Sequence, residues 1–174
     1  MTIYVELLSN DACLTGALLN FDNASRLSDG LQIDVLGIRI APIFQLLVSR
    51  PTAVDQALIV QGQVVVKGFH VTLARPDQMG LVLGENLALP KPPHILLLSD
   101  TVRLVDSGAK QSCYIEVDDL HQNDLRLYVR ACEAVFGITL LNEARIFHVT
   151  VSNAGQGHPR LSVGEVWGYP SRRI

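Results

Sequence analysis

Residues 68–74 of the chain read GFHVTLA, and residues 146–152 read IFHVTVS. Both stretches are rich in β-branched and aromatic residues and alternate in polarity, which predicts two β-strands. Residues two apart on a strand project from the same face. His70 and Thr72 should therefore lie side by side on one strand, as should His148 and Thr150 on the other.

The remaining residues of the two copies predict what lies behind these polar side chains. The apolar residues at alternate positions should point away from the histidines and enter the hydrophobic core. By the same alternation, Ser152 is expected on the polar face with His148 and Thr150. An imidazole and a hydroxyl placed alike on two strands indicate one shared site.

Such a site has a definite chemical use. Two facing histidines can serve as general base and general acid, because imidazole titrates near neutral pH. Two neighbouring threonine hydroxyls can hydrogen-bond the non-bridging oxygens of a phosphate and stabilise the charge that develops on them. These groups suffice for phosphodiester cleavage with water or a 2′-hydroxyl as the nucleophile.

The paired motifs, HVTL at 70–73 and HVTV at 148–151, resemble the H-x-T-x signature of the 2H phosphoesterase superfamily. That superfamily includes bacterial RNA ligase/2′,3′-cyclic phosphodiesterases, 2′-5′ oligoadenylate phosphodiesterases and phage enzymes that destroy cyclic-nucleotide signals. The resemblance implies that His70 and His148 are the catalytic acid and base. It implies that Thr72 and Thr150 bind the phosphate.

The resemblance also implies a fold. The superfamily is α+β, with two antiparallel-sheet lobes related by a pseudo-twofold axis around a central cleft and with helices on the outside. We expect residues 1–174 to form one such domain, in which residues 1–60 are an N-terminal elaboration. Residues 64–151 resemble the family layout of motif strand, hairpin, helix and motif strand.

Local patterns predict the elements around the motifs. Helical spacing predicts a helix over about 10–27, and a β-branched pattern predicts a strand over 31–40. Two strands, 95–105 and 111–117, should form a hairpin. Asp118 or Asp119 should cap a helix that Gly137 ends, and the second motif strand should begin at Arg145.

The predicted function is a phosphodiesterase that needs no metal and no other cofactor. Its substrate would be a nucleotide or a short RNA: a 2′,3′-cyclic phosphate, a 2′-5′ or 3′-5′ oligonucleotide, or a cyclic oligonucleotide signal. One alternative is a nucleotide-binding module on the same scaffold that does not turn its ligand over. Another is a structural α+β protein in which both H-x-T pairs are hydrogen-bonded core groups.

Further side chains are candidates for substrate contact. Tyr114 shares its predicted strand face with Ser112 and Glu116, and it could stack on a base if that face borders the site. Trp167 and Tyr169, near the chain end, are similar candidates. His158, in a glycine-rich loop, could reach the phosphate. Core packing for the aromatic residues and solvent exposure for His158 are the alternative interpretations.

Composition limits the class of partner. The net charge of −3 and the pI of about 5.9 argue against binding long duplex nucleic acid through its phosphates. No apolar run approaches the roughly 18 residues of a membrane span, and no signal peptide is evident. The three cysteines form no CxxC pair, which is typical of reduced thiols. We therefore expect a cytoplasmic protein without a membrane partner and without a metal site.

Overall fold

The computed structural model describes residues 3–6, 13–14, 31–34, 37–40, 44–51, 54, 60, 62–66, 68–74, 90–93, 95–155, 163 and 166–174. Its first strands are β1 (Ile3–Glu6), β2 (Cys13–Leu14), β3 (Leu31–Asp34), β4 (Gly37–Ile40), β5 (Phe44–Val48), β6 (Val64–Val65) and β7 (Phe69–Ala74). They are followed by β8 (Ile95–Asp106), β9 (Lys110–Val117), α3 (Asp119–Phe136), β10 (His148–Gly155), the short 3₁₀ helix η2 (Val166–Gly168) and β11 (Ser171–Arg173).

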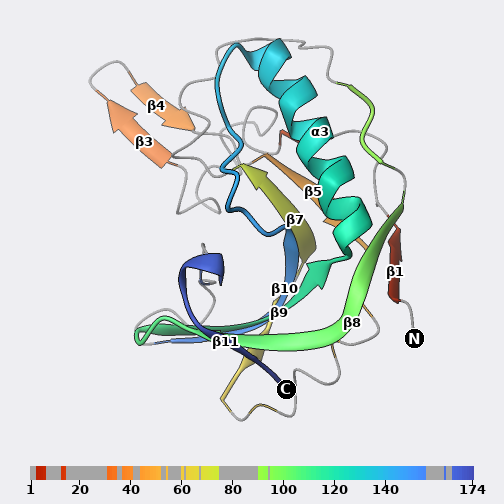
Figure 1. The fold of residues 1–174 in the computed structure, drawn as a ribbon. Coiled ribbons are helices and arrows are strands. Elements are labelled where there is room, and N and C mark those ends of the chain that lie inside the picture. The colour runs from red at the N-terminus through yellow and green to blue at the C-terminus, as the bar shows by residue number, and fades with distance from the viewer. Residues whose placement is uncertain are drawn as a thin grey trace.

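The described strands form one large antiparallel sheet in which the two motif strands are neighbours. Its order is β1-β8-β9-β10-β7-β5-β2, while β11 pairs with β8 and β6 pairs with β10. The strands β3 and β4 form a separate two-stranded sheet. Figure 1 shows the long helix α3 across one side of the large sheet and η2 on the other. This combination of a helix with an antiparallel sheet confirms the predicted α+β class.

Three of the described strands in the first 60 residues, β1, β2 and β5, belong to the large sheet. The strand β5 lies directly beside the first motif strand, β7, and β1 pairs with β8 near the other edge. Leu46, Val48 and Val54 are buried in the main hydrophobic core. The sheet and its core therefore depend on this part of the chain.

Two local predictions in this region are wrong. Cys13 and Leu14 lie in strand β2 and pair with β5, so the predicted helix over 10–27 is not formed there. Pairing between strands overrides the helical spacing of the local apolar residues. The rest of that predicted helix lies outside the described residues. The predicted strand over 31–40 is two strands, β3 and β4, which pair with each other.

The hairpin and helix between the motifs form as predicted. The strands β8 and β9 pair antiparallel, and Asp118 caps α3 by accepting a hydrogen bond from the Leu120 amide at 3.1 Å. Gly137 ends the helix with φ of 69°, a left-handed conformation that costs glycine little. The second motif strand begins later than predicted, at His148. The Arg145 amide bonds the Asn142 carbonyl in a turn, which keeps Arg145 out of the strand.

The sheet face beneath α3 is the main hydrophobic core. Val71, Leu73 and Val149, from the apolar sides of the two motifs, are fully buried there with Leu125 and Val129 of α3. Each such side chain contributes about 1.5–3 kcal/mol when removed from water. A one-residue slip of either motif strand would turn this set outward, so the core fixes which face carries the histidines.

One buried polar side chain joins α3 to the start of the second motif strand. Gln122 donates from Nε2 to the carbonyls of Val117 (3.1 Å) and Phe147 (2.7 Å). Its Oε1 accepts the Phe147 amide at 2.9 Å. Two of these three hydrogen bonds fix the backbone of Phe147, immediately before His148, and the third holds the end of β9. We refer to this arrangement as the Gln122 clamp.

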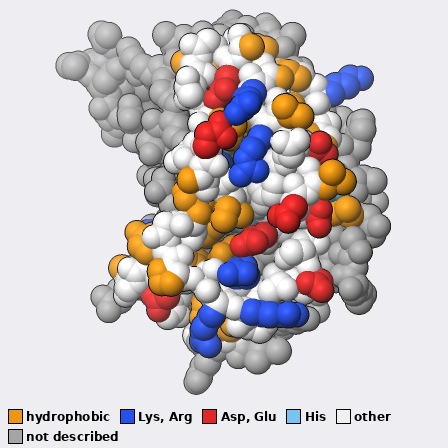
Figure 2. All heavy atoms as spheres, viewed as in Figure 1, with side chains coloured by type: hydrophobic (Ala, Val, Ile, Leu, Met, Phe, Trp, Pro, Cys, Tyr) orange, Lys and Arg blue, Asp and Glu red, His pale blue; other side chains and the backbone are white. Residues whose placement is uncertain are grey.

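The surface seen in Figure 2 mixes the two signs of charge. Basic and acidic side chains are interspersed among hydrophobic ones over the described part of that face, which shows no continuous basic area. None of the helices in the described segments has the length and apolar character required to cross a membrane.

We predict that Gln122→Leu lowers the free energy of unfolding by about 2–4 kcal/mol, because it leaves the buried Phe147 amide without its acceptor and removes two further bonds. Urea unfolding followed by circular dichroism measures the loss. The exposed neighbour Asn123 provides the control, since Asn123→Ala should change stability by less than about 0.5 kcal/mol. Equal stability of the Gln122 variant and the wild type would show that the clamp contributes nothing.

Candidate active site

The two motif strands pair directly with each other. Val71 of β7 lies opposite Val149 of β10 in an antiparallel register. Because the strands are antiparallel, the residue before Val71 faces the residue after Val149, and the residue after Val71 faces the residue before Val149. The histidine of each motif is consequently placed across from the threonine of the other motif.

This register gathers the four predicted site residues on one face of the sheet. His70 lies across from Thr150, and Thr72 lies across from His148, with directly opposed Cβ atoms about 5 Å apart. All four side chains are partly exposed, whereas the alternate residues of both strands enter the core. Sequence alternation alone predicted the face of each residue within its own strand. Only the pairing places the two motifs in one group.

Backbone contacts fix the orientation of the His148 ring. Its Nδ1 lies 2.8 Å from the Ile146 carbonyl oxygen. Because a carbonyl oxygen can only accept, Nδ1 must carry the proton, and Nε2 of the neutral ring is left with a lone pair. The Tyr114 ring meets the imidazole edge-on, with centroids 5.2 Å apart and planes at 68°. Aromatic pairs favour this T-shaped geometry.

His70 is held in the corresponding way. Its ring hydrogen-bonds the backbone of Gly68, two residues earlier, just as His148 bonds Ile146. Gly68 lies between β6 and β7, directly before the first residue of the motif strand. Each motif thus orients its own imidazole through a carbonyl that it supplies itself.

Burial favours the neutral form of both imidazoles. Burial lowers the pKa of His70 below its ordinary value of 6.5, although the bond to Gly68 acts in the opposite direction. Burial also lowers the pKa of His148, to about 4. The hydrogen bond to the Ile146 carbonyl opposes this shift. The positive charge of Arg145, and that of His70 whenever His70 is protonated, lower the pKa of His148 further. A bound anion would favour protonation of both rings.

The strand β9 continues the site on the side of His148. Glu116 lies opposite His148, and Tyr114 lies opposite Thr150. Arg103 of β8 lies opposite Tyr114, and its Nε is 3.4 Å from Glu116 Oε1. The shared face of Tyr114 and Glu116 was evident from alternation. Arg103 was missed, because its place depends on the register of the β8–β9 hairpin.

A small second hydrophobic cluster covers one end of this face. Tyr114 packs there with Val105, Val163 and Val166, and Trp167 lies against the group. The Val163 amide donates to Ser112 Oγ at 2.8 Å, which ties the C-terminal segment to β9. Tyr114 is only 2% exposed, so its ring supports His148 and offers no open face to a base.

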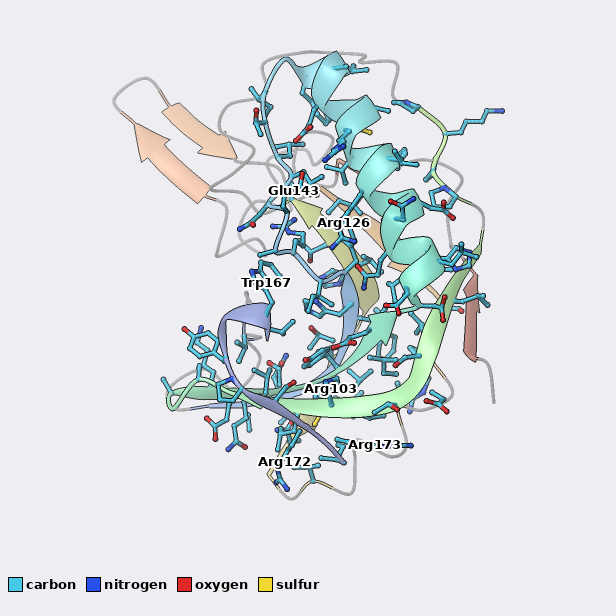
Figure 3. All side chains as sticks on the ribbon, viewed as in Figure 1. Arg103, Arg126, Glu143, Trp167, Arg172 and Arg173 are labelled. Atoms are coloured by element: carbon cyan, nitrogen blue, oxygen red, sulfur yellow. The ribbon has the colours of Figure 1, made fainter. Side chains whose placement is uncertain are left out.

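The candidate aromatic residues near the chain end lie in different surroundings. The guanidinium of buried Arg145 lies 5.6 Å from the centre of the Trp167 ring, and its Nη1 donates to the Leu73 carbonyl. Figure 3 shows Trp167 leaving η2 toward the segment between α3 and β10. Trp167 is partly exposed beside the site, whereas Tyr169 is 46% exposed and outside the second cluster.

The expectation that Ser152 shares the polar face is wrong. The register of β10 against β9 shifts between Thr150 and Ser152, so that Ser152 lies opposite the core residue Cys113. An irregularity of this kind adds one residue to a strand and reverses the alternation beyond it. Ser152 Oγ donates instead to Gln63 Oε1 at 2.8 Å.

The other histidines add no described group to the site. His158 lies outside the described residues. His121, in the first turn of α3, accepts the Leu97 amide at Nδ1 over 3.3 Å and so joins the helix to β8. Within the described segments, no three His, Cys, Asp or Glu side chains are grouped so that they could hold a metal ion.

No protein-family model, curated protein or solved structure matches the chain significantly. The interpretation of the site therefore depends on its own geometry. That geometry provides two oriented imidazoles, two hydroxyls and a nearby arginine on one sheet face. Such a set can bind an anion and move protons at two places.

We predict that His148 makes the protein less stable in acid. Above pH 6.5 the ring is neutral in both states, but between pH 6.5 and about 4 only the unfolded chain binds the proton. The free energy of unfolding should therefore fall as the pH is lowered through this range. Urea unfolding at several pH values should show a steeper fall for the wild type than for His148→Gln, by up to about one proton per molecule. Parallel pH dependences would contradict the assignment.

Proposed function

We propose that the chain is a two-histidine phosphodiesterase that acts on a nucleotide or a short RNA. The observation that carries the proposal is the antiparallel register at Val71 and Val149, which brings both H-x-T motifs into one group. A purely structural role for the motifs would account for the hydrogen bond that each histidine ring makes to a backbone carbonyl. It would not account for two imidazoles and two hydroxyls that converge on one partly exposed patch.

The proposed reaction uses one histidine at each end of an in-line displacement. One imidazole removes a proton from water or from a 2′-hydroxyl, and that oxygen forms a bond to phosphorus. The bond from phosphorus to the leaving oxygen breaks, and the second, protonated imidazole donates its proton to that oxygen. Thr72 and Thr150 donate hydrogen bonds to the non-bridging oxygens, whose charge grows in the transition state.

The sheet order supports the two-lobed arrangement that the 2H resemblance implies. On one side of the β7–β10 pair lie β9, β8 and β1, and on the other side lie β5 and β2. We infer that these halves are the two lobes and that a pseudo-twofold axis passes through the Val71–Val149 pair. The substrate would lie over this axis, between the two histidines. Each half then supplies one imidazole and one hydroxyl.

The lowered pKa values suit a site that becomes active when substrate binds. With both rings neutral, either can act as the base, but the acid must first gain a proton. A phosphodiester carries a negative charge, which raises the pKa of a neighbouring imidazole. Substrate binding would therefore help to supply the proton that the leaving group needs.

We predict turnover of at least one class in a panel of 2′,3′-cyclic mononucleotides, 2′-5′ and 3′-5′ oligoadenylates and cyclic oligonucleotides, measured by mass spectrometry in EDTA. His70→Asn and His148→Asn should each reduce kcat/KM by about 100-fold or more. Thr72→Val and Thr150→Val should reduce it by about 10- to 100-fold.

The matched control for the histidines is His121→Asn, which replaces a histidine outside the site and retains a hydrogen-bond acceptor. It should keep full activity, and circular dichroism checks that every variant is folded. Binding of a nucleotide without turnover would support the binding module instead. Activity that survives in both folded motif-histidine variants would refute the mechanism.

We predict a bell-shaped dependence of kcat/KM on pH, with its maximum on the acid side of 6.5. The profile of kcat/KM reports the free enzyme, in which burial lowers the pKa of both imidazoles below that value. Because the two histidines interact, the two limbs of the pH profile report pKa values of the pair and not of either residue alone. The profile of kcat should lie at higher pH, because bound substrate raises both pKa values. A maximum of kcat/KM well above neutral pH would contradict this assignment.

A further inference from the structure

Two arginines face each other where β11 joins the sheet. Arg173 of β11 lies opposite Arg103 of β8. Arg103 lies opposite Tyr114, which in turn lies opposite Thr150 of the second motif. Directly opposed residues on paired strands project from the same face. The two guanidinium groups therefore belong to the face that carries the motif histidines.

The charges on this part of the face are not balanced. Like charges directly opposite each other on neighbouring strands destabilise a sheet. Arg103 is compensated, because it pairs with Glu116 and donates to Ser171 Oγ at 3.0 and 3.1 Å. Arg173 is exposed, and no carboxylate in the described segments forms an ion pair with it. Within the described segments, the pair therefore retains one positive charge that an anion could satisfy.

Arg103 and Arg173 are placed where they could bind a phosphate next to the one that reacts at the histidines. Two strand spacings, roughly 10 Å, separate the backbones of Arg103 and Thr150. The Arg103 side chain reaches toward Glu116, which lies opposite His148. The length of an arginine side chain lets its guanidinium group extend across this span toward a phosphate beside the reacting one. The planar fork of arginine matches two phosphate oxygens, which makes it the preferred side chain for this anion.

We propose that Arg103 and Arg173 form a subsite for a second phosphate of the substrate. The substrate class would then be a nucleotide with at least two phosphates, such as a short oligonucleotide, in preference to a mononucleotide with a single cyclic phosphate. This inference rests on the proposed phosphodiesterase function for the identity of the ligand. It adds to that function the means of recognising the substrate beyond the reacting group.

The neighbouring residue provides a matched control. Arg172 lies opposite Leu104, so it projects from the other face of the sheet. Figure 3 shows Arg172 and Arg173 together at the end of the sheet near Arg103, with their side chains leaving β11 in different directions. Both are exposed, and replacing either one by alanine removes the same charge. Only Arg173→Ala should alter the subsite.

The test is calorimetric binding of two adenylate dimers, one without terminal phosphates and one with a phosphate at both ends. The full chain carries His70→Asn and His148→Asn so that neither dimer is cleaved. We expect the terminal phosphates to tighten Kd about tenfold, and we expect Arg173→Ala to abolish that gain. Arg172→Ala should preserve it. The salt dependence of Kd should weaken for Arg173→Ala alone.

The possible results separate this subsite from the proposed function. If the wild-type chain turns over no phosphodiester but the phosphate effect persists and depends on Arg173, the subsite stands and the phosphodiesterase proposal fails. If a substrate is turned over but Arg173→Ala and Arg172→Ala behave alike, the function stands and the subsite is overturned. Equal binding of the two dimers, or no binding of either, would also overturn the subsite.

Discussion

The pairing of Val71 with Val149 is the constraint on which the rest of the site depends. It joins two strands that are far apart in the chain, and the hydrophobic core beneath α3 fixes their register. Displacing either strand by one residue would bury a histidine and expose a valine. The free energy that stabilises the fold therefore also aligns the two imidazoles with the two hydroxyls. Folding and site assembly share one set of contacts.

The second motif strand is held from several directions. The Gln122 clamp binds the backbone on both sides of Phe147, immediately before His148. Tyr114 supports the imidazole from β9, and the C-terminal segment covers Tyr114 in turn. His148 itself bonds the carbonyl two residues earlier. A ring with few orientations available would be preorganised for the proposed proton transfer, because little entropy would be lost on substrate binding.

Electrostatics divides the polar face into two zones. The histidines are partly buried and neutral, which favours their use as proton carriers once an anion is present. The arginines of β8 and β11 are charged and lie farther along the same face. Glu116 lies between the zones, opposite His148 and paired with Arg103. This order places fixed positive charge beside a pair of titratable groups, which suits a ligand with more than one phosphate.

The sequence by itself determined the local features: the two motif strands, the hairpin between them, the capped helix from Asp119 and the face on which the histidine and threonine of each motif lie. These follow from alternation, capping and turn chemistry, which act over a few residues. Only the tertiary structure decided that β7 and β10 are neighbours, that Cys13 lies in a strand and that Ser152 faces the core. It also decided that Arg103 and Arg173 share the face of the histidines. Each of these depends on which strands pair and in what register, and contacts between distant segments set that choice.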